Sequence, residues 1–173
     1  GLVPVSEVAL IHADPPYGVA LAVQPKTGRR TRPKVWLPVV GDDRPYDPAP
    51  LLALDRPTVL WGANHYSDRV PGSPAWIFWD KRPDIVPDMQ SDGEIAWSNL
   101  GGPLRTFRHV WRHFVRGGET GSHVHPTQKP IALSAYVFQR AKLKPGALVF
   151  VPFLGSGPDL PAARAMGLRV IAC

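Results

Sequence analysis

A strand-like apolar run at residues 5–13 ends in Asp14-Pro15-Pro16-Tyr17, and this combination constrains the protein more than any other feature. The run predicts a buried strand that delivers Asp14 at its C-terminal end. Asp14 can accept a hydrogen bond from an amino group, and the carbonyl of Pro15 can accept a second one. Tyr17 offers a ring for stacking. These residues suit a flat ring that carries an amine; the alternative is a proline-rich turn after a strand.

Two further apolar runs, at residues 58–61 and 75–79, also end in polar residues. This pattern is typical of parallel strands in an α/β sheet, whose ligands bind along the C-terminal edge. Residues 94–98 and 104–111 predict two more strands, and the alternation in the second suggests an antiparallel pair at one side of the sheet. The predicted fold class is therefore α/β with a mainly parallel sheet.

Helices and strands alternate in the last third of the chain. We expect a helix at 130–141, a turn at 144–146, a strand at 147–151, a helix at 158–166 and a strand that begins at residue 168.

The strand at 147–151 is followed by the small residues Gly155, Ser156 and Gly157 and then by a helix. This arrangement is typical of a turn that binds a nucleotide-type cofactor, because backbone N–H groups can approach the ligand and the helix N-terminus favours an anion. In a doubly wound sheet, distant strand ends can be neighbours. We therefore expect Asp14 to face this turn.

The composition limits the kind of protein that this chain can be. The 173 residues fit one domain, and 44% hydrophobic with 20% charged residues indicate a soluble globular protein. A formal charge of +6 and a pI near 9.8 favour a polyanionic partner such as nucleic acid. One cysteine suggests a reducing compartment, and no metal-ligand spacing accompanies the histidines. No apolar run could span a membrane and no signal peptide is evident, so we expect a cytoplasmic protein.

Basic residues gather in two irregular segments. Residues 19–57 are rich in proline and glycine, which suggests a mobile loop over a site, with a short helix at 48–54. Residues 83–124 could recognise a target, or they could be a sheet edge with a solvated basic face. The side chains expected to contact nucleic acid are Lys26, Arg29, Arg30, Arg32, Lys81, Arg82, Arg105, Arg108 and Arg112.

Three motifs occur in one order: Asp-Pro-Pro-Tyr at 14–17, His-Pro-Thr-Gln-Lys-Pro at 125–130 and Pro-Phe-x-Gly-Ser-Gly at 152–157. Together they resemble the S-adenosylmethionine-dependent amino-methyltransferases of DNA. The catalytic motif precedes the cofactor motif, as in the circularly permuted β group. Similarity to phage- and prophage-associated adenine methylases is carried by Gly41-Asp42-Asp43, Leu60-Trp-Gly-Ala-Asn64, Trp79-Asp-Lys-Arg82 and Ser91-Asp-Gly-Glu-Ile-Ala-Trp97.

The resemblance implies a Rossmann-like class I methyltransferase fold, with residues 1–173 as one domain. Residues 1–18 would hold the catalytic strand and motif, and residues 125–173 would bind S-adenosylmethionine. The implied catalytic residues are Asp14, Pro15, Pro16 and Tyr17. Asp14 and the Pro15 carbonyl would hold the N6 amine of an adenine flipped out of double-stranded DNA, with Tyr17 stacked on the base. The implied cofactor-binding residues are Asp14, His125, Pro126, Thr127, Gln128, Lys129, Pro152, Phe153, Gly155, Ser156 and Gly157.

The chain departs from the family where Val151 stands in place of Asp and Pro158 in place of Thr. It also ends at Cys173, before a strand and a helix that the family usually has, which predicts a core shortened at this side. We favour an adenine-N6 DNA methyltransferase. The alternatives are a degenerate, non-catalytic DNA-binding relative and a cytosine-N4 methyltransferase. The recognition sequence and the choice between monomer and dimer stay open.

Overall fold

The computed structural model describes residues 4–19, 40–83, 91–111, 119 and 128–173. The strands in this part of the chain are β1 (Val8–Ala13), β2 (Thr58–Trp61), β3 (Ile77–Asp80), β4 (Gly93–Ser98), β5 (Arg105–Arg108), β6 (Leu148–Val151) and β7 (Arg169–Ala172). The helices are α1 (Ala49–Leu52), α2 (Ile131–Arg140) and α3 (Asp159–Ala165), with short 3-10 turns at Val5–Glu7, Ala63–His65 and Ser67–Arg69. Within these residues, no helix is long and apolar enough to cross a membrane.

The described strands form one sheet in the order β5-β3-β4-β2-β1-β6-β7. Among them, β4 alone runs opposite to its neighbours, and the other strands share one direction. This confirms the prediction of a mainly parallel α/β sheet. After β1, strands β2 to β5 form one side of the sheet, and β6 and β7 lie on the other side of β1. The strand order therefore reverses between β1 and β6, where open α/β sheets form their ligand crevice.

The predicted neighbourhood of the two motif-bearing strands is confirmed. β1 and β6 pair in parallel, with Leu10 opposite Val149 and Ile11 opposite Phe150. The expected antiparallel pairing at one side of the sheet is confirmed, because β4 pairs antiparallel with β2 and with β3. Residues 94–98 and 104–111 are not themselves neighbours, since β3 lies between β4 and β5. Alternation along one run carries no information about which strand lies beside it.

The predicted helices lie within a few residues of the observed ones. The helix expected at 130–141 is α2, with Pro130 as its N-cap residue, and the helix expected at 158–166 is α3. Gly167 has a φ of 65° and follows α3, as expected for a helix that ends at a left-handed residue. The short helix expected at 48–54 is α1.

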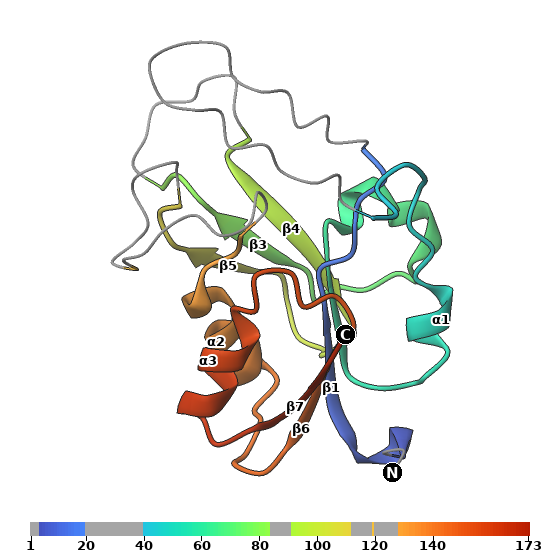
Figure 1. The fold of residues 1–173 in the computed structure, drawn as a ribbon. Helices are drawn as coiled ribbons and strands as arrows, with labels where there is room; N and C mark the ends of the chain where they lie inside the picture. Colours follow the sequence, from blue (N-terminus) through green and yellow to red (C-terminus); the bar gives the residue numbers. More distant parts are fainter. Residues whose placement is uncertain (1–3, 20–39, 84–90, 112–118, 120–127) are drawn as a thin grey trace.

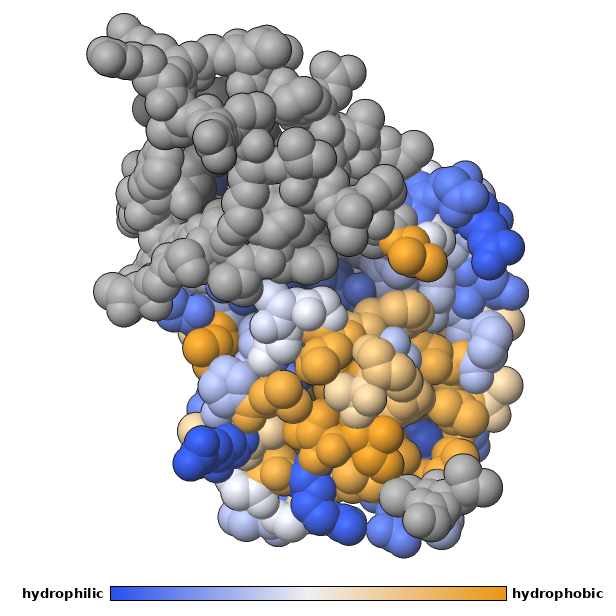
Figure 2. Space-filling view, viewed as in Figure 1, coloured by the Kyte–Doolittle hydropathy of each residue, from blue (hydrophilic) through white to orange (hydrophobic). Residues whose placement is uncertain are grey.

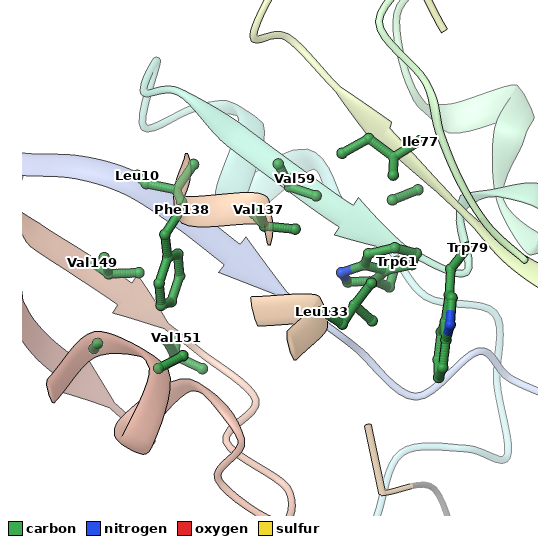
Figure 3. Close-up of a cluster of buried hydrophobic side chains, with 13 residues drawn as sticks. Leu10, Val59, Trp61, Ile77, Trp79, Leu133, Val137, Phe138, Val149 and Val151 are labelled. Atoms are coloured by element: carbon green, nitrogen blue, oxygen red, sulfur yellow. The ribbon is translucent and has the colours of Figure 1, made fainter. Parts of the chain in front are cut away.

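The main core lies between the sheet and the two helices α2 and α3, which cover one face (Figure 1). Leu133, Val137 and Phe138 follow helical spacing along α2, so one stripe of this helix points at the sheet. Figure 3 shows these side chains interleaved with those of the strands. The strand residues in this cluster include Leu10, Val59, Trp61, Ile77, Trp79, Val149 and Val151.

On the opposite face of the sheet, the described helical elements are α1 and short 3-10 turns (Figure 1). In the described part of the segment 19–57, Leu51 and Leu54 of the α1 region pack against β1 and β6. Phe150 and Ile171 on β6 and β7 are only partly buried there. Figure 2 shows hydrophobic residues over this part of the molecule. Residues 20–39 of the predicted loop lie outside the described residues.

The core between α2 and the sheet gives a direct test of this packing. Phe138→Ala should lower the free energy of unfolding by about 3–5 kcal/mol, because the side chain is fully buried and its loss leaves a cavity. Ile131→Ala on the same helix is the control, since this residue is 39% exposed, and it should change stability by less than about 1 kcal/mol. Urea unfolding measures both. Equal losses would contradict the packing of α2 through its Phe138 face.

Candidate active site

The carboxylate of Asp14 lies directly beyond the end of β1 and is held by two donors. Its Oδ1 accepts a hydrogen bond from the Tyr17 hydroxyl at 2.7 Å, and its Oδ2 contacts the Lys129 ammonium at 2.7 Å. The side chain is still 26% exposed. Because each carboxylate oxygen can accept two hydrogen bonds, Asp14 retains capacity to accept one from a ligand.

Lys129, immediately before α2, places its ammonium between two carboxylates. Its Nζ lies 2.7 Å from Asp14 Oδ2 and 2.9 Å from Glu94 Oε2. Burial by itself would lower the pKa of Lys129, but the carboxylates of Asp14 and Glu94 outweigh it and raise the pKa above its usual value. The lysine is therefore a permanent cation that is compensated on two sides.

Glu94 on β4 is the second acid of this cluster. Its Oε2 lies 3.2 Å from the Tyr17 hydroxyl, whose single proton is shared with the closer Asp14, and it pairs with both Lys129 and Lys81. Burial alone would raise the pKa of Glu94, but Lys129 and Lys81 lower it to about 2. Glu94 was not among the site residues predicted from the sequence. The sequence signal that could have identified Glu94 is its charge near the start of an otherwise apolar strand.

Tyr17 lies at the centre of this cluster. Its ring stacks on His65 with 5.1 Å between centroids and 14° between planes, so His65 covers one face. Burial, followed by the negative charges of Asp14 and Glu94, raises the pKa of Tyr17 well above its usual value. The phenol therefore stays protonated and can donate to these carboxylates.

Gly62, directly after β2, makes room for Tyr17. A Cβ atom added at Gly62 would lie 2.0 Å from Cε1 of Tyr17, and the residue has a φ of 68°. Only glycine satisfies both conditions, because it lacks a Cβ and tolerates a positive φ. The polar residues after this strand were visible in the sequence, but no local pattern assigned a role to Gly62 or His65.

The expected cofactor turn follows β6. The ring of Phe153 packs edge-on against Tyr46 at 5.6 Å, and the Gly157 amide donates to the Leu154 carbonyl at 2.8 Å. Within the described part of the chain, the amides of Gly155 and Ser156 donate to no backbone carbonyl. These two amides are candidate donors to a ligand at this turn.

The other residues expected to bind the cofactor differ in how far the structure describes them. The Gln128 carbonyl accepts a hydrogen bond from Trp111 Nε1 at 2.9 Å, and Pro152 is partly buried at the start of the turn. His125, Pro126 and Thr127 lie outside the described residues. Val151 is 1% exposed within the main core, so an acid at this position would be buried among apolar side chains.

The expected DNA-binding residues differ in exposure. Arg105 and Arg108 on the edge strand β5 are exposed, and Arg108 makes a long contact with Asp80 at 3.7 Å. Lys81 pairs with Glu94, and the side chain of Arg82 is 3% exposed beside Asp92. Lys26, Arg29, Arg30, Arg32 and Arg112 lie outside the described residues.

The arrangement of the sheet is shared with solved structures. The structure of PvuII DNA methyltransferase (cytosine-N4-specific) matches 95% of this chain and 74% of its own, with a TM-score of 0.55 and 13% identity. This chain has a Rossmann-like methyltransferase fold. A second similar structure is the M1.HpyAVI–SAM complex, with a TM-score of 0.48 and 18% identity over 95% of this chain and 81% of that chain. A third is TTHA0409 from Thermus thermophilus with S-adenosyl-L-methionine, with a TM-score of 0.46 and 14% identity over 98% of this chain and 82% of that chain. No family model matches the sequence.

The contact between Gly62 and Tyr17 predicts a large effect of a small substitution. Gly62→Ala should destabilise the methyltransferase fold by about 2–4 kcal/mol, because it adds both backbone strain and overlap with the Tyr17 ring. Gly72→Ala is the matched control, since a Cβ there meets nothing within 4 Å, and it should be close to neutral. Thermal or urea unfolding gives the comparison. A neutral Gly62→Ala would contradict the position assigned to Tyr17.

The lowered pKa of Glu94 predicts a pH dependence of stability. The folded-state pKa of about 2 lies below the unfolded value of 4.5, so this contribution is present above pH 4.5 and is lost as the pH falls towards 2. At neutral pH, Glu94→Gln should therefore be less stable than the unmodified chain by on the order of 3 kcal/mol. Denaturant unfolding of both proteins from pH 7 to pH 2 should show this gap narrowing below pH 4.5. A gap independent of pH would contradict the pairing of Glu94 with the two lysines.

Proposed function

We propose that this protein is a DNA methyltransferase that transfers a methyl group from S-adenosylmethionine to the N6 amine of a flipped-out adenine. The observation that carries the proposal is the parallel pairing of β1 with β6 at the reversal of strand order. The Asp14–Tyr17 motif follows β1, and the Pro152–Gly157 turn follows β6. A group that holds an amine and a turn that suits a cofactor thus follow neighbouring strand ends, where ligands of such sheets bind.

The residues after β6 fit the proposed cofactor. Among the described residues, no backbone carbonyl accepts from the amides of Gly155 and Ser156, so they could donate to polar groups of a ligand, and Phe153 offers a partly exposed ring beside them. Lys129 precedes α2, in the motif that resembles the contact for the methionine end of the cofactor. S-adenosylmethionine supplies, when bound, a methyl group on a positively charged sulfur, which an amine lone pair can attack.

Asp14 and the carbonyl of Pro15 would hold the target amine by its two hydrogens. This arrangement biases the nitrogen lone pair out of conjugation with the ring and towards the methyl group. The methylated nitrogen is acidic and releases its proton to water, so the site needs no strong base. Catalysis then depends mainly on positioning and electrostatics.

Double-stranded DNA is the proposed partner. The formal charge of +6 favours a polyanion, and the exposed Arg105 and Arg108 on β5 are available to contact phosphates. Reaction at a base edge inside a duplex requires the base to leave the stack. Because phosphate contacts supply most of the affinity, DNA binding should survive changes in the amine-holding residues.

Two other candidate functions differ in what they require of the site. Cytosine N4 is an amine of the same kind, and Asp14 and Pro15 could hold it equally; an acid at the first motif position favours adenine. A degenerate, non-catalytic relative is favoured by Val151, whose buried apolar surroundings leave no polar contact for a cofactor at that position. Calorimetric titration with S-adenosylmethionine separates this relative from an enzyme.

Asp14 is the residue on which the proposed chemistry depends most. Asp14→Ala should reduce methyl transfer by at least about 100-fold, because the acceptor for the amine is lost, while DNA affinity changes by less than about threefold. Tritiated methyl transfer to unmethylated DNA and a DNA-binding titration measure the two quantities. Digestion of the product to nucleosides identifies the methylated base.

Two variants complete this experiment. Asp14→Asn keeps the size of the side chain and one acceptor oxygen but removes the charge that pairs with Lys129, so its transfer should lie between that of Asp14→Ala and that of the unmodified chain. Asp68→Asn is the control, since this carboxylate is 80% exposed on a surface turn, and it should retain full transfer. Undiminished transfer by Asp14→Ala would show that the reaction takes place elsewhere.

A further inference from the structure

A buried polar pair links β1 to α3 beneath the proposed site. Nδ1 of His12 lies 2.6 Å from Oδ1 of Asp159, and each side chain is only 7% exposed. His12 stands two residues before Asp14, and Asp159 stands two residues after Gly157. The proposed reaction does not use either side chain directly, so this pair needs a separate explanation.

The hydrogen bonds fix the protonation of His12. The indole Nε1 of Trp61 approaches Nε2 of His12 at 2.9 Å, and an indole N–H can only donate. Nε2 must therefore accept, which leaves the single ring proton on Nδ1. His12 is thus a neutral imidazole that donates to Asp159, and its edge contacts the Phe138 ring at 5.8 Å between centroids.

Ser134 on α2 lies beside Asp159 and favours its charged form. Burial by itself would raise the pKa of Asp159, but hydrogen bonding from His12 and the neighbouring Ser134 hydroxyl lowers it. The carboxylate therefore stays ionised within the core, and Trp61, His12 and Asp159 form a continuous hydrogen-bonded network with Ser134 next to its acid.

Every member of this network adjoins a segment of the proposed site. Trp61 precedes Gly62, which makes room for Tyr17, and Ser134 lies in the first half of α2, which follows Lys129. An apolar core would also hold β1, β2, α2 and α3 together, but apolar contacts have no preferred direction. Hydrogen bonds fix distance and orientation, which matters where reacting groups must meet within a fraction of an ångström.

We propose that His12 and Asp159 are positioning residues, which set the distance and orientation between the amine-holding residues after β1 and the cofactor turn before α3. This role rests on the proposed function. A pair that only stabilises the core would affect folding and leave the reaction of the folded protein unchanged.

Variants of Asp159 separate these two roles. Asp159→Ala removes the acceptor of His12 and should lower kcat for methyl transfer by about 30- to 100-fold, with KM for DNA changed by less than about threefold. Asp159→Asn keeps an acceptor oxygen and should recover most of this kcat. Val137→Ala is the control for lost core stability, since this residue is fully buried in the main core and its side chain has no hydrogen-bonding group. It should leave kcat near that of the unmodified chain once folded.

Nitrogen NMR of the His12 ring tests the geometry without any reaction. The spectrum of the unmodified chain should show a protonated Nδ1 and an unprotonated Nε2 at neutral pH, and Asp159→Ala should abolish this preference. A protonated Nε2 would overturn the proposal, as would a kcat of Asp159→Ala equal to that of Val137→Ala. Failure of the unmodified chain to bind S-adenosylmethionine would instead overturn the proposed function, and the positioning role with it.

Discussion

The ammonium of Lys129 between the carboxylates of Asp14 and Glu94 is the interaction on which the site depends. At a separation of roughly 4 Å, two like charges repel by about 4 kcal/mol at an effective dielectric constant of about 20. The two acids can share one partly buried cluster because the Lys129 ammonium lies between them and Lys81 also pairs with Glu94. Since Asp14 follows β1, Glu94 belongs to β4 and Lys129 precedes α2, this ammonium also ties three separate segments together.

The sheet determines which segments can meet at this ammonium. β1, the first strand of the described chain, lies inside the sheet with β2 on one side and β6 on the other. Both motifs of the proposed reaction follow the C-terminal ends of neighbouring strands for this reason. The antiparallel β4 has the opposite direction, so its N-terminal end, with Glu94, lies at the edge where the parallel strands end.

Two polar networks thus lie at different depths next to the ends of β1 and β6. The partly exposed network of Asp14, Tyr17, Glu94 and Lys129 offers groups that a ligand can contact. The buried network around His12 and Asp159 connects the elements beneath it. Each side chain of the two networks has a partner, which is the condition for keeping polar groups inside an apolar core.

The sequence by itself determined the elements and the local chemistry of the protein. Apolar runs and turn residues predicted most strands and helices within a few residues, and the Asp14–Tyr17 and Pro152–Gly157 motifs were recognised directly, because these signals depend on neighbours in the chain. Only the tertiary structure decided that β3 separates β4 from β5, that Gly62 and His65 hold Tyr17, and that Lys129 joins Asp14 to Glu94. Lys129 and Tyr17, for example, stand 112 positions apart and are in contact. No local pattern encodes such contacts, because the folding of the sheet brings the side chains together.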